Sequence, residues 1–154
     1  MPKLISFIGD YNMAKSGRAF ADRKKIENIA ASKTIEVADC GTIFTIGAAT
    51  STLELPTMAA AGKGWWCRFV VNDETAAVVI DKASGDAANK MVGSVITGGD
   101  GSAMQLQPTT PGTAFDKITF TTSVIQGDFV EISTDGSLWF VTGQSSVADA
   151  ITCA

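Results

Sequence analysis

Short runs of alternating hydrophobic and polar residues recur along this chain from Lys33 onward, and clusters of Gly, Asp, Asn and Pro separate them. A period of two places successive side chains on opposite faces of a strand, and closely spaced turn signals are typical of a sandwich or barrel. We therefore predict an all-β fold: a single antiparallel β-sandwich or barrel, jelly-roll-like. The expected strands are Thr34–Val37, Thr42–Ile46, Thr52–Leu55, Trp65–Val71, Ala77–Ile80, Val92–Ile96, Lys117–Thr121, Asp128–Ser133 and Leu138–Thr142.

The clearest local signal is the segment Gly127–Gly143, which reads GDFVEISTDGSLWFVTG. Two alternating runs flank Asp135-Gly136, and this dipeptide supplies the positive φ angles that tight hairpin turns require. The segment is therefore predicted to be an antiparallel hairpin.

The chain divides into an N-terminal basic arm, residues 1–32, and a β domain, residues 33–154. Within the arm, Ala19–Ala31 has a weak helical stripe, and an extended arm that ends in a strand over Lys24–Ile29 is equally compatible; we favour the extended arm. Apart from Val92–Ile96, residues 82–114 are rich in small residues and are predicted to be loop, which at this length is typical of a functional, partner-ordered or mobile segment.

Charge is distributed unevenly between these two parts. Residues 1–33 carry seven Lys and Arg and three Asp and Glu, a net charge of +4. The remaining residues carry five Lys and Arg and thirteen Asp and Glu, a net charge of −8. Opposite charges of this kind can steer assembly between copies or onto an acidic partner. The basic run Arg23-Lys24-Lys25 lacks the interleaved aromatic residues of nucleic-acid-binding segments, so we favour contact with an acidic protein surface.

The composition argues against an enzyme. The chain has no histidine, which removes the commonest general base and the commonest zinc ligand. Its cysteines, Cys40, Cys67 and Cys153, are odd in number and widely spaced, so we expect free thiols in a reducing cytoplasm, with Cys67 as a buried hydrophobe. We predict no catalytic residue, metal or cofactor. No apolar run is long enough for a membrane span, and we read no signal peptide.

Other candidate positions have ordinary structural explanations. Adjacent strand residues face opposite ways, so one of Trp65 and Trp66 is expected in the core and the other on the surface, where it could meet a partner or a sugar. The carboxylates of Asp128, Glu131 and Asp135 are expected to be solvated. The glycine-rich segment 98–101 lacks the Lys and Ser/Thr of a phosphate loop.

Several short motifs follow one another along the chain in two halves. A first half carries the pattern D-x-G-x-x-F, then LP, then G-x-x-x-x-F, and a second half carries GD-x-V, DG-x-x-W-x-V-x-G and A-D-x-I. The matching positions are Asp39, Gly41, Phe44, Leu55, Pro56, Gly64, Phe69, Gly127, Asp128, Val130, Asp135, Gly136, Trp139, Val141, Gly143, Ala148, Asp149 and Ile151. Over roughly residues 24–154 the chain resembles the head decoration (cement) proteins of tailed phages.

This resemblance implies a structural protein on the outer surface of the phage head, which stabilises the lattice of the major capsid protein. The implied partners are the major capsid protein and further copies of the chain, as a homotrimer, with no nucleic acid and no membrane. The LP and DG-x-x-W elements also resemble modules of phage tail fibres and spikes, so a module that binds a host receptor or glycan is the alternative. Positions expected to bind the capsid or another copy are Lys3, Arg18, Arg23, Lys24, Lys25, Trp66, Gly99 and Asp100.

Overall fold

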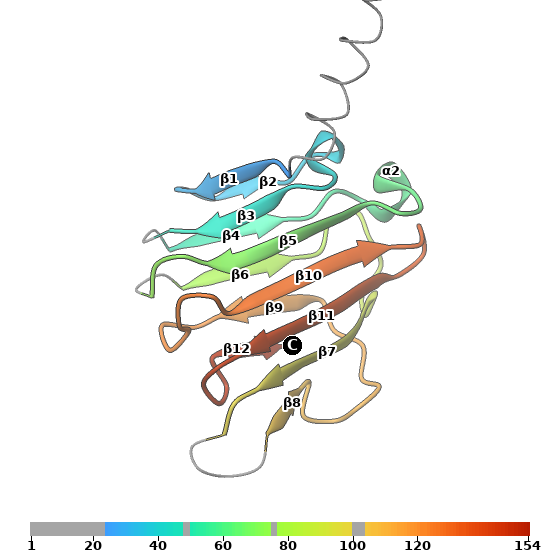
Figure 1. Cartoon of the computed structure of the whole chain (residues 1–154). Helices are drawn as coiled ribbons and strands as arrows, with labels where there is room; N and C mark the ends of the chain where they lie inside the picture. Colours follow the sequence, from blue (N-terminus) through green and yellow to red (C-terminus); the bar gives the residue numbers. More distant parts are fainter. Residues whose placement is uncertain (1–23, 48–49, 75–76, 100–103) are drawn as a thin grey trace, which may run out of the picture.

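A computed structural model of the chain describes residues 24–47, 50–74, 77–99 and 104–154, and over these residues the fold is predominantly β (Figure 1). The larger sheet, sheet A, has seven strands in the order β1 (Ile26–Ile29), β3 (Ile43–Ile46), β5 (Trp66–Val71), β10 (Phe129–Thr134), β11 (Trp139–Ser145), β7 (Met91–Thr97) and β8 (Gln105–Gln107). The smaller, sheet B, has five in the order β12 (Ile151–Cys153), β9 (Lys117–Phe120), β6 (Val78–Asp81), β4 (Ser51–Glu54) and β2 (Lys33–Thr34). The all-β prediction is confirmed.

The first six strands alternate between the two sheets. The chain passes from β1 in sheet A to β2 in sheet B and back, and it repeats this until β6, so that it winds around a common interior (Figure 1). Because each winding runs in the same direction, β1, β3 and β5 are parallel to one another, and so are β2, β4 and β6. The sheets are therefore mixed, and the purely antiparallel arrangement predicted from the sequence is wrong.

The second half of the chain completes both sheets with strands that pair mainly in antiparallel fashion. β10 lies between β5 and β11 and is antiparallel to both, while β9 is antiparallel to β6 and β12. The predicted hairpin is confirmed: Thr134 pairs with Trp139, Gly136 has a φ of +90°, and Asp135 Oδ1 accepts hydrogen bonds from two backbone N–H groups. In neither sheet do the two end strands pair with each other, so the described strands form no closed barrel.

The inward-facing residues of both sheets form one hydrophobic cluster, which fills the space between the two layers. In sheet A, the rings of Phe44 and Phe69 stack with their centroids 5.3 Å apart. Trp65 meets Trp139 edge to face at 5.5 Å and donates from Nε1 to the Val37 carbonyl at 3.0 Å. These aromatic side chains are fully or almost fully buried.

The strand expected at the end of the arm is present as β1, and because β1 pairs with β3, this last part of the arm belongs to sheet A; residues 1–23 lie outside the described residues. Other elements differ from the sequence-based expectation. The predicted strand Thr34–Val37 is replaced by β2, which covers Lys33–Thr34, and by a short 3-10 helix that begins at Val37. β8 lies within the predicted loop and β12 within the predicted polar tail, and both are short strands that pair with longer neighbours. A short helix, α2 (Met58–Ala61), occupies a segment that we expected to be flexible.

The side chain of Asp128 is buried, so the prediction that it is solvated is wrong. Its Oδ2 accepts a hydrogen bond from Ile125 N at 2.9 Å, and its Oδ1 accepts bonds from Ser146 N and Ser146 Oγ, each at 2.8 Å. It thus joins the turn before β10 to the end of β11. Glu131 is partly exposed and Asp135 is exposed, as expected.

Candidate interaction surface

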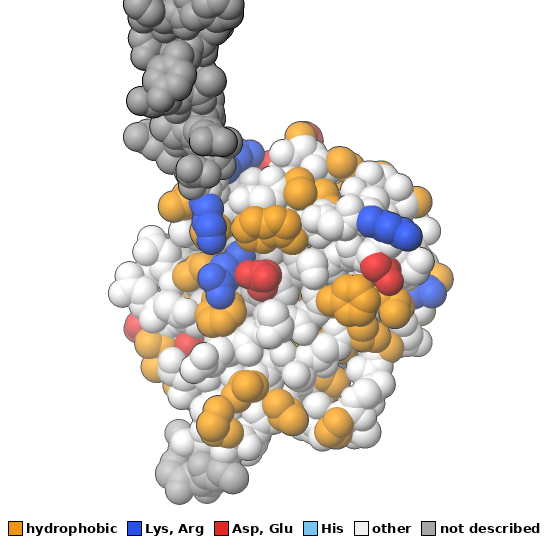
Figure 2. All heavy atoms as spheres, turned by 45° about the vertical axis from the view of Figure 1, so that its right-hand side comes forward, with side chains coloured by type: hydrophobic (Ala, Val, Ile, Leu, Met, Phe, Trp, Pro, Cys, Tyr) orange, Lys and Arg blue, Asp and Glu red, His pale blue; other side chains and the backbone are white. Residues whose placement is uncertain are grey.

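The outer face of sheet A is rich in hydrophobic side chains, although it faces away from the core. Strict alternation along the strands puts every second residue there, and the strand register aligns these residues in rows across the sheet. Figure 2 views this side obliquely and shows hydrophobic side chains spread over it. The outward hydrophobic residues are Ile26, Ile43, Trp66, Val70, Val92, Ile96, Leu106, Phe129 and Phe140.

Charge is scarce on this face. Arg68 of β5 and Glu131 of β10 are the charged residues among the outward positions of the described strands, and they are direct cross-strand neighbours. Arg68 Nε lies 3.7 Å from Glu131 Oε2, and the guanidinium carbon lies 4.1 Å from the centroid of the Phe129 ring. Arg68 Nε is itself buried and has no hydrogen-bond partner among the described residues. β10 is the fourth of seven strands, so this pair lies at the centre of the sheet.

Sheet B has a polar outer face, which shows that the apolar character of sheet A is not general. Its outward residues are mostly threonines and charged residues, and Glu54, Asp81 and Lys117 follow one another across three neighbouring strands. A shallow hollow of about 270 Å³ lies beside them, lined by Thr52, Glu54, Asp81, Lys82 and Ser84. Depletion of charge together with exposed aromatic residues is the signature of a protein interface, and sheet A has it whereas sheet B does not.

The two adjacent tryptophans divide as predicted. Trp65 is 2% exposed in the core, whereas Trp66 begins β5 with its ring on the outer face of sheet A. Lys24 Nζ lies 6.0 Å from the centroid of the Trp66 ring, at the limit of a cation–π contact. The described chain therefore begins beside this ring, at one corner of the apolar face.

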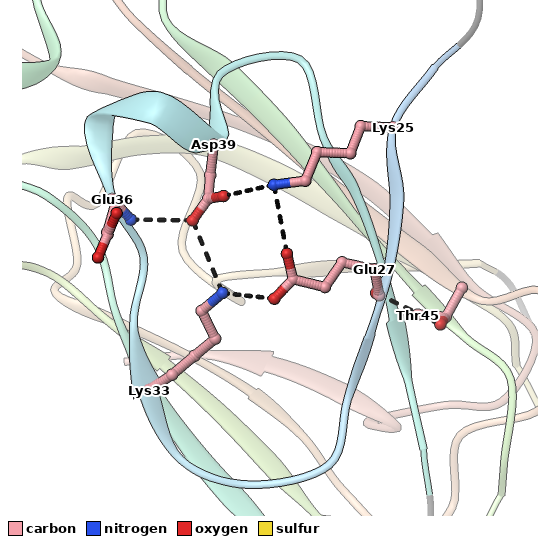
Figure 3. Close-up of polar contacts among 6 residues, drawn as sticks. All are labelled: Lys25, Glu27, Lys33, Glu36, Asp39 and Thr45. Atoms are coloured by element: carbon pink, nitrogen blue, oxygen red, sulfur yellow. Dashed lines mark hydrogen bonds and ion pairs between the residues drawn. The ribbon is translucent and has the colours of Figure 1, made fainter.

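A cluster of charged side chains closes the β1 edge of the domain (Figure 3). Glu27 pairs with Phe44 across β1 and β3, so its side chain points inward at the end of the core. Lys33 Nζ approaches Glu27 Oε1 at 2.5 Å and Asp39 Oδ2 at 3.7 Å, and it lies 5.2 Å from the Phe44 ring centroid. Lys25 Nζ completes the cluster, 2.9 Å from Asp39 Oδ1 and 3.4 Å from Glu27 Oε2.

This cluster favours the charged form of each of three members. The hydrogen bond from Lys33, aided by Lys25, holds the pKa of Glu27 below its ordinary value. Burial opposes ionisation of Asp39, but bonds from Lys25 and from Glu36 N outweigh it, so the pKa of Asp39 is also lowered. The bond to Asp39 raises the pKa of Lys25. An inward charge at an edge strand deters further strand pairing, so we interpret the cluster as an end cap for sheet A.

The structure brings together only part of the predicted binding set. Lys24 and Trp66 lie side by side, whereas Lys25 is held in the charged cluster. Gly99 is half-buried in the segment after β7. Lys3, Arg18, Arg23 and Asp100 lie outside the described residues. Sequence reasoning missed Phe129 and Phe140; their alternation with buried neighbours could have marked them as outward-facing, but only the strand register places them on the face of Trp66.

The three cysteines are free, and Cys67 is fully buried as predicted. Burial raises the pKa of the Cys67 thiol and raises that of Cys153 to about 12. No group of three or more His, Cys, Asp or Glu residues in the described ranges could hold a metal ion. No helix there is long and apolar enough to cross a membrane.

Comparisons with known proteins return no relative. No family model, no curated protein and no solved structure matches the chain.

Proposed function

We propose that this chain is a structural virion protein, a capsid decoration protein that binds the outer surface of a phage head and stabilises the major capsid protein lattice. The observation that carries the proposal is the outer face of sheet A, on which hydrophobic and aromatic residues surround a single central ion pair. Covering such an apolar face with a partner removes hydrophobic surface from water and lowers the free energy of the assembly, as expected for a component of a larger structure.

The residues that carry the resemblance to decoration proteins serve the fold. Gly136 permits the hairpin turn, Trp139 is fully buried in the core, and Asp128 ties two segments together. A side chain at Gly143 would meet the backbone of β10. The shared pattern therefore describes a rigid β-module, which suits a protein whose role is to bind and brace. We further interpret the two layers as a β-sandwich, since one hydrophobic cluster draws on both sheets.

The basic segment supplies a second contact in this proposal. Lys3, Arg18, Arg23 and Lys24 belong to a stretch that meets the domain beside Trp66. We propose that this segment reaches across to an acidic surface of the major capsid protein while the β domain sits on the outside of the head. Localisation to the virion and assembly in the bacterial cytoplasm follow from the same proposal.

The test is where the protein lies in purified virions and how much of it is there. We expect hundreds of copies that remain with DNA-filled heads after tails are removed, and we expect heads that lack the protein to bind the purified chain until saturation. Heads without it should rupture at lower osmotic stress or temperature. A handful of copies that follow the tail would contradict the proposal.

A tail fibre module that binds a glycan is the second candidate, and Trp66 favours it. Its ring lies on an outer face with Lys24 beside it, and such aromatic surfaces stack on sugars as well as on proteins. Binding of purified chain to host cells or host polysaccharide, lost in Trp66→Ala, would support this alternative.

A further inference from the structure

We propose that the outer face of sheet A is the contact between two copies of this chain, which pack face to face about a two-fold axis. This inference rests on the assembly role proposed above and names the partner of the same surface. The axis would lie in the interface, parallel to the strands and midway between β5 and β10. Identical patches then meet each other, as in the commonest class of protein dimer.

The central ion pair is self-complementary under this axis. Arg68 and Glu131 sit opposite each other on β5 and β10. The axis between these strands brings Arg68 of one copy over Glu131 of the second copy, and the reverse contact forms at the same time. Each guanidinium would gain a second carboxylate. Arg68 Nε is buried without a hydrogen-bond partner among the described residues, and it lies 3.7 Å from the carboxylate of its own chain, so the pair is incompletely bonded in a single copy.

The neighbouring positions are complementary in size. Trp66 pairs with Ser133 across β5 and β10, so the same axis places each Trp66 ring over the small Ser133 side chain of the second copy. On the other side of the ion pair, Val70 pairs with Phe129, and each would meet the other across the interface. Large side chains thus oppose smaller ones, which lets two faces interlock. Because sheets twist, and packed sheets cross at about 30°, the register is inferred for these two strands only.

The available area suits a reversible dimer. The five central strands are spaced about 4.8 Å apart and have about six residues of 3.3 Å each, so they cover roughly 24 by 20 Å. Two such faces remove about 1,000 Å² from water, the lower bound for a specific biological interface. The outer face of sheet B, with Glu54 and Asp81 as adjacent like charges, offers no comparable self-complementary surface.

Charge reversal in the full-length chain tests this contact, with mass measured by sedimentation velocity and light scattering over a concentration series. We expect the unchanged chain to form dimers. Arg68→Glu alone and Glu131→Arg alone should each weaken dimerisation by roughly tenfold or more, because like charges then face each other twice. An equimolar mixture of these two variants should recover the dimer, and so should the double variant R68E/E131R.

Matched variants separate this contact from loss of folding. Lys117→Glu makes the same charge change on the outer face of sheet B and should leave the dimer unchanged. Ser133→Trp fills the space over which the second copy's Trp66 would lie and should abolish the dimer, whereas Ser137→Trp in the exposed hairpin turn should not. Circular dichroism and thermal unfolding check that each variant is folded.

Two outcomes would overturn the inference: a monomer at all concentrations, or an oligomer, including the trimer that the resemblance implies, whose mass none of these variants changes. Head binding is measured separately. If the chain dimerises as stated but does not bind heads, the result supports this interface and contradicts the capsid role. If the chain decorates heads as a monomer, the result contradicts this interface alone.

Discussion

Gly143 illustrates how a single backbone position fixes the packing of strands in sheet A. An added Cβ at this position would lie 2.6 Å from the Phe129 carbonyl oxygen and 3.0 Å from Val130 Cγ2. The first of these atoms belongs to the β10 backbone and cannot move without loosening the β10–β11 pair. Gly93 of β7 is still more constrained, since its φ is +136° and a Cβ would overlap the Val141 carbonyl.

We therefore expect Gly143→Ala to lower the free energy of unfolding by about 1–3 kcal/mol, the usual range for an overpacked interior. Urea unfolding followed by tryptophan fluorescence measures this loss. Gly85→Ala is the control, because a Cβ there meets only Thr57 Cγ2 at 3.4 Å and the expected change is within about 0.5 kcal/mol. Equal stability of the two variants would contradict the close approach of β10 and β11.

At the level of elements, the charged cluster explains how an edge strand with few hydrophobic residues remains in place. β1 reads IENI, and its Ile26 is 66% exposed, so the strand contributes little to the core beyond Ile29. Ion pairs hold the strand where hydrophobic contacts are few. They join Lys25, Glu27 and Lys33 to one another and extend to Asp39 in η1 (Val37–Asp39).

This cluster should make the free energy of unfolding fall as the pH is lowered. The folded-state pKa values of Glu27 and Asp39 are lowered, so their stabilising effect is present above their ordinary values of 4.5 and 3.8 and is lost as the pH falls through the folded-state values. Lys33→Met removes the main cause of the Glu27 shift. We expect this variant to lose less stability than the unchanged chain between pH 7 and pH about 3.

Urea unfolding at the two pH values measures that difference. Glu54 and Asp135, whose pKa values are also held low by backbone hydrogen bonds, titrate in both proteins and cancel in the comparison. Lys90→Met removes a positive charge outside the cluster and should preserve the acid dependence of the unchanged chain. An identical acid dependence in the Lys33→Met variant would show that the cluster does not stabilise β1.

For the molecule as a whole, the boundary between arm and domain determines what a truncation tests. Removal of residues 1–23 leaves β1 and the charged cluster intact, whereas removal of residues 1–30 deletes β1 and, with it, Lys25 and Glu27 of the cluster. We expect the first variant to keep the thermal midpoint of the full chain but to bind heads more weakly, because it lacks Lys3, Arg18 and Arg23.

The second truncation should melt at a lower temperature, because it exposes the β3 edge and leaves Asp39 without Lys25. Differential scanning calorimetry and co-sedimentation with heads measure the two effects. Unchanged head binding after removal of residues 1–23 would exclude the basic segment as an anchor.

Alternation along the chain was sufficient to predict most strands and the hairpin at Asp135-Gly136, because local pattern determines which residues face inward. It could not predict the parallel order of the first six strands, since side-chain alternation is the same whichever neighbour a strand pairs with. Asp128 was misjudged for a related reason: its partner Ser146 lies in a distant segment. Trp66 was placed correctly, but the rest of the candidate surface depends on the register between strands.

The winding of the first six strands has a consequence for synthesis on the ribosome. Its pairings join neighbouring parts of the sequence, such as Ile26 with Ile43, whereas the partner of Val70 is Phe129. The first half can therefore pair as it emerges, and β5 then waits with one edge open until β10 is made. Because β5 carries some of the most hydrophobic residues of the chain, this interval is when a nascent chain is most prone to aggregate, and slow translation between β6 and β10 would prolong it.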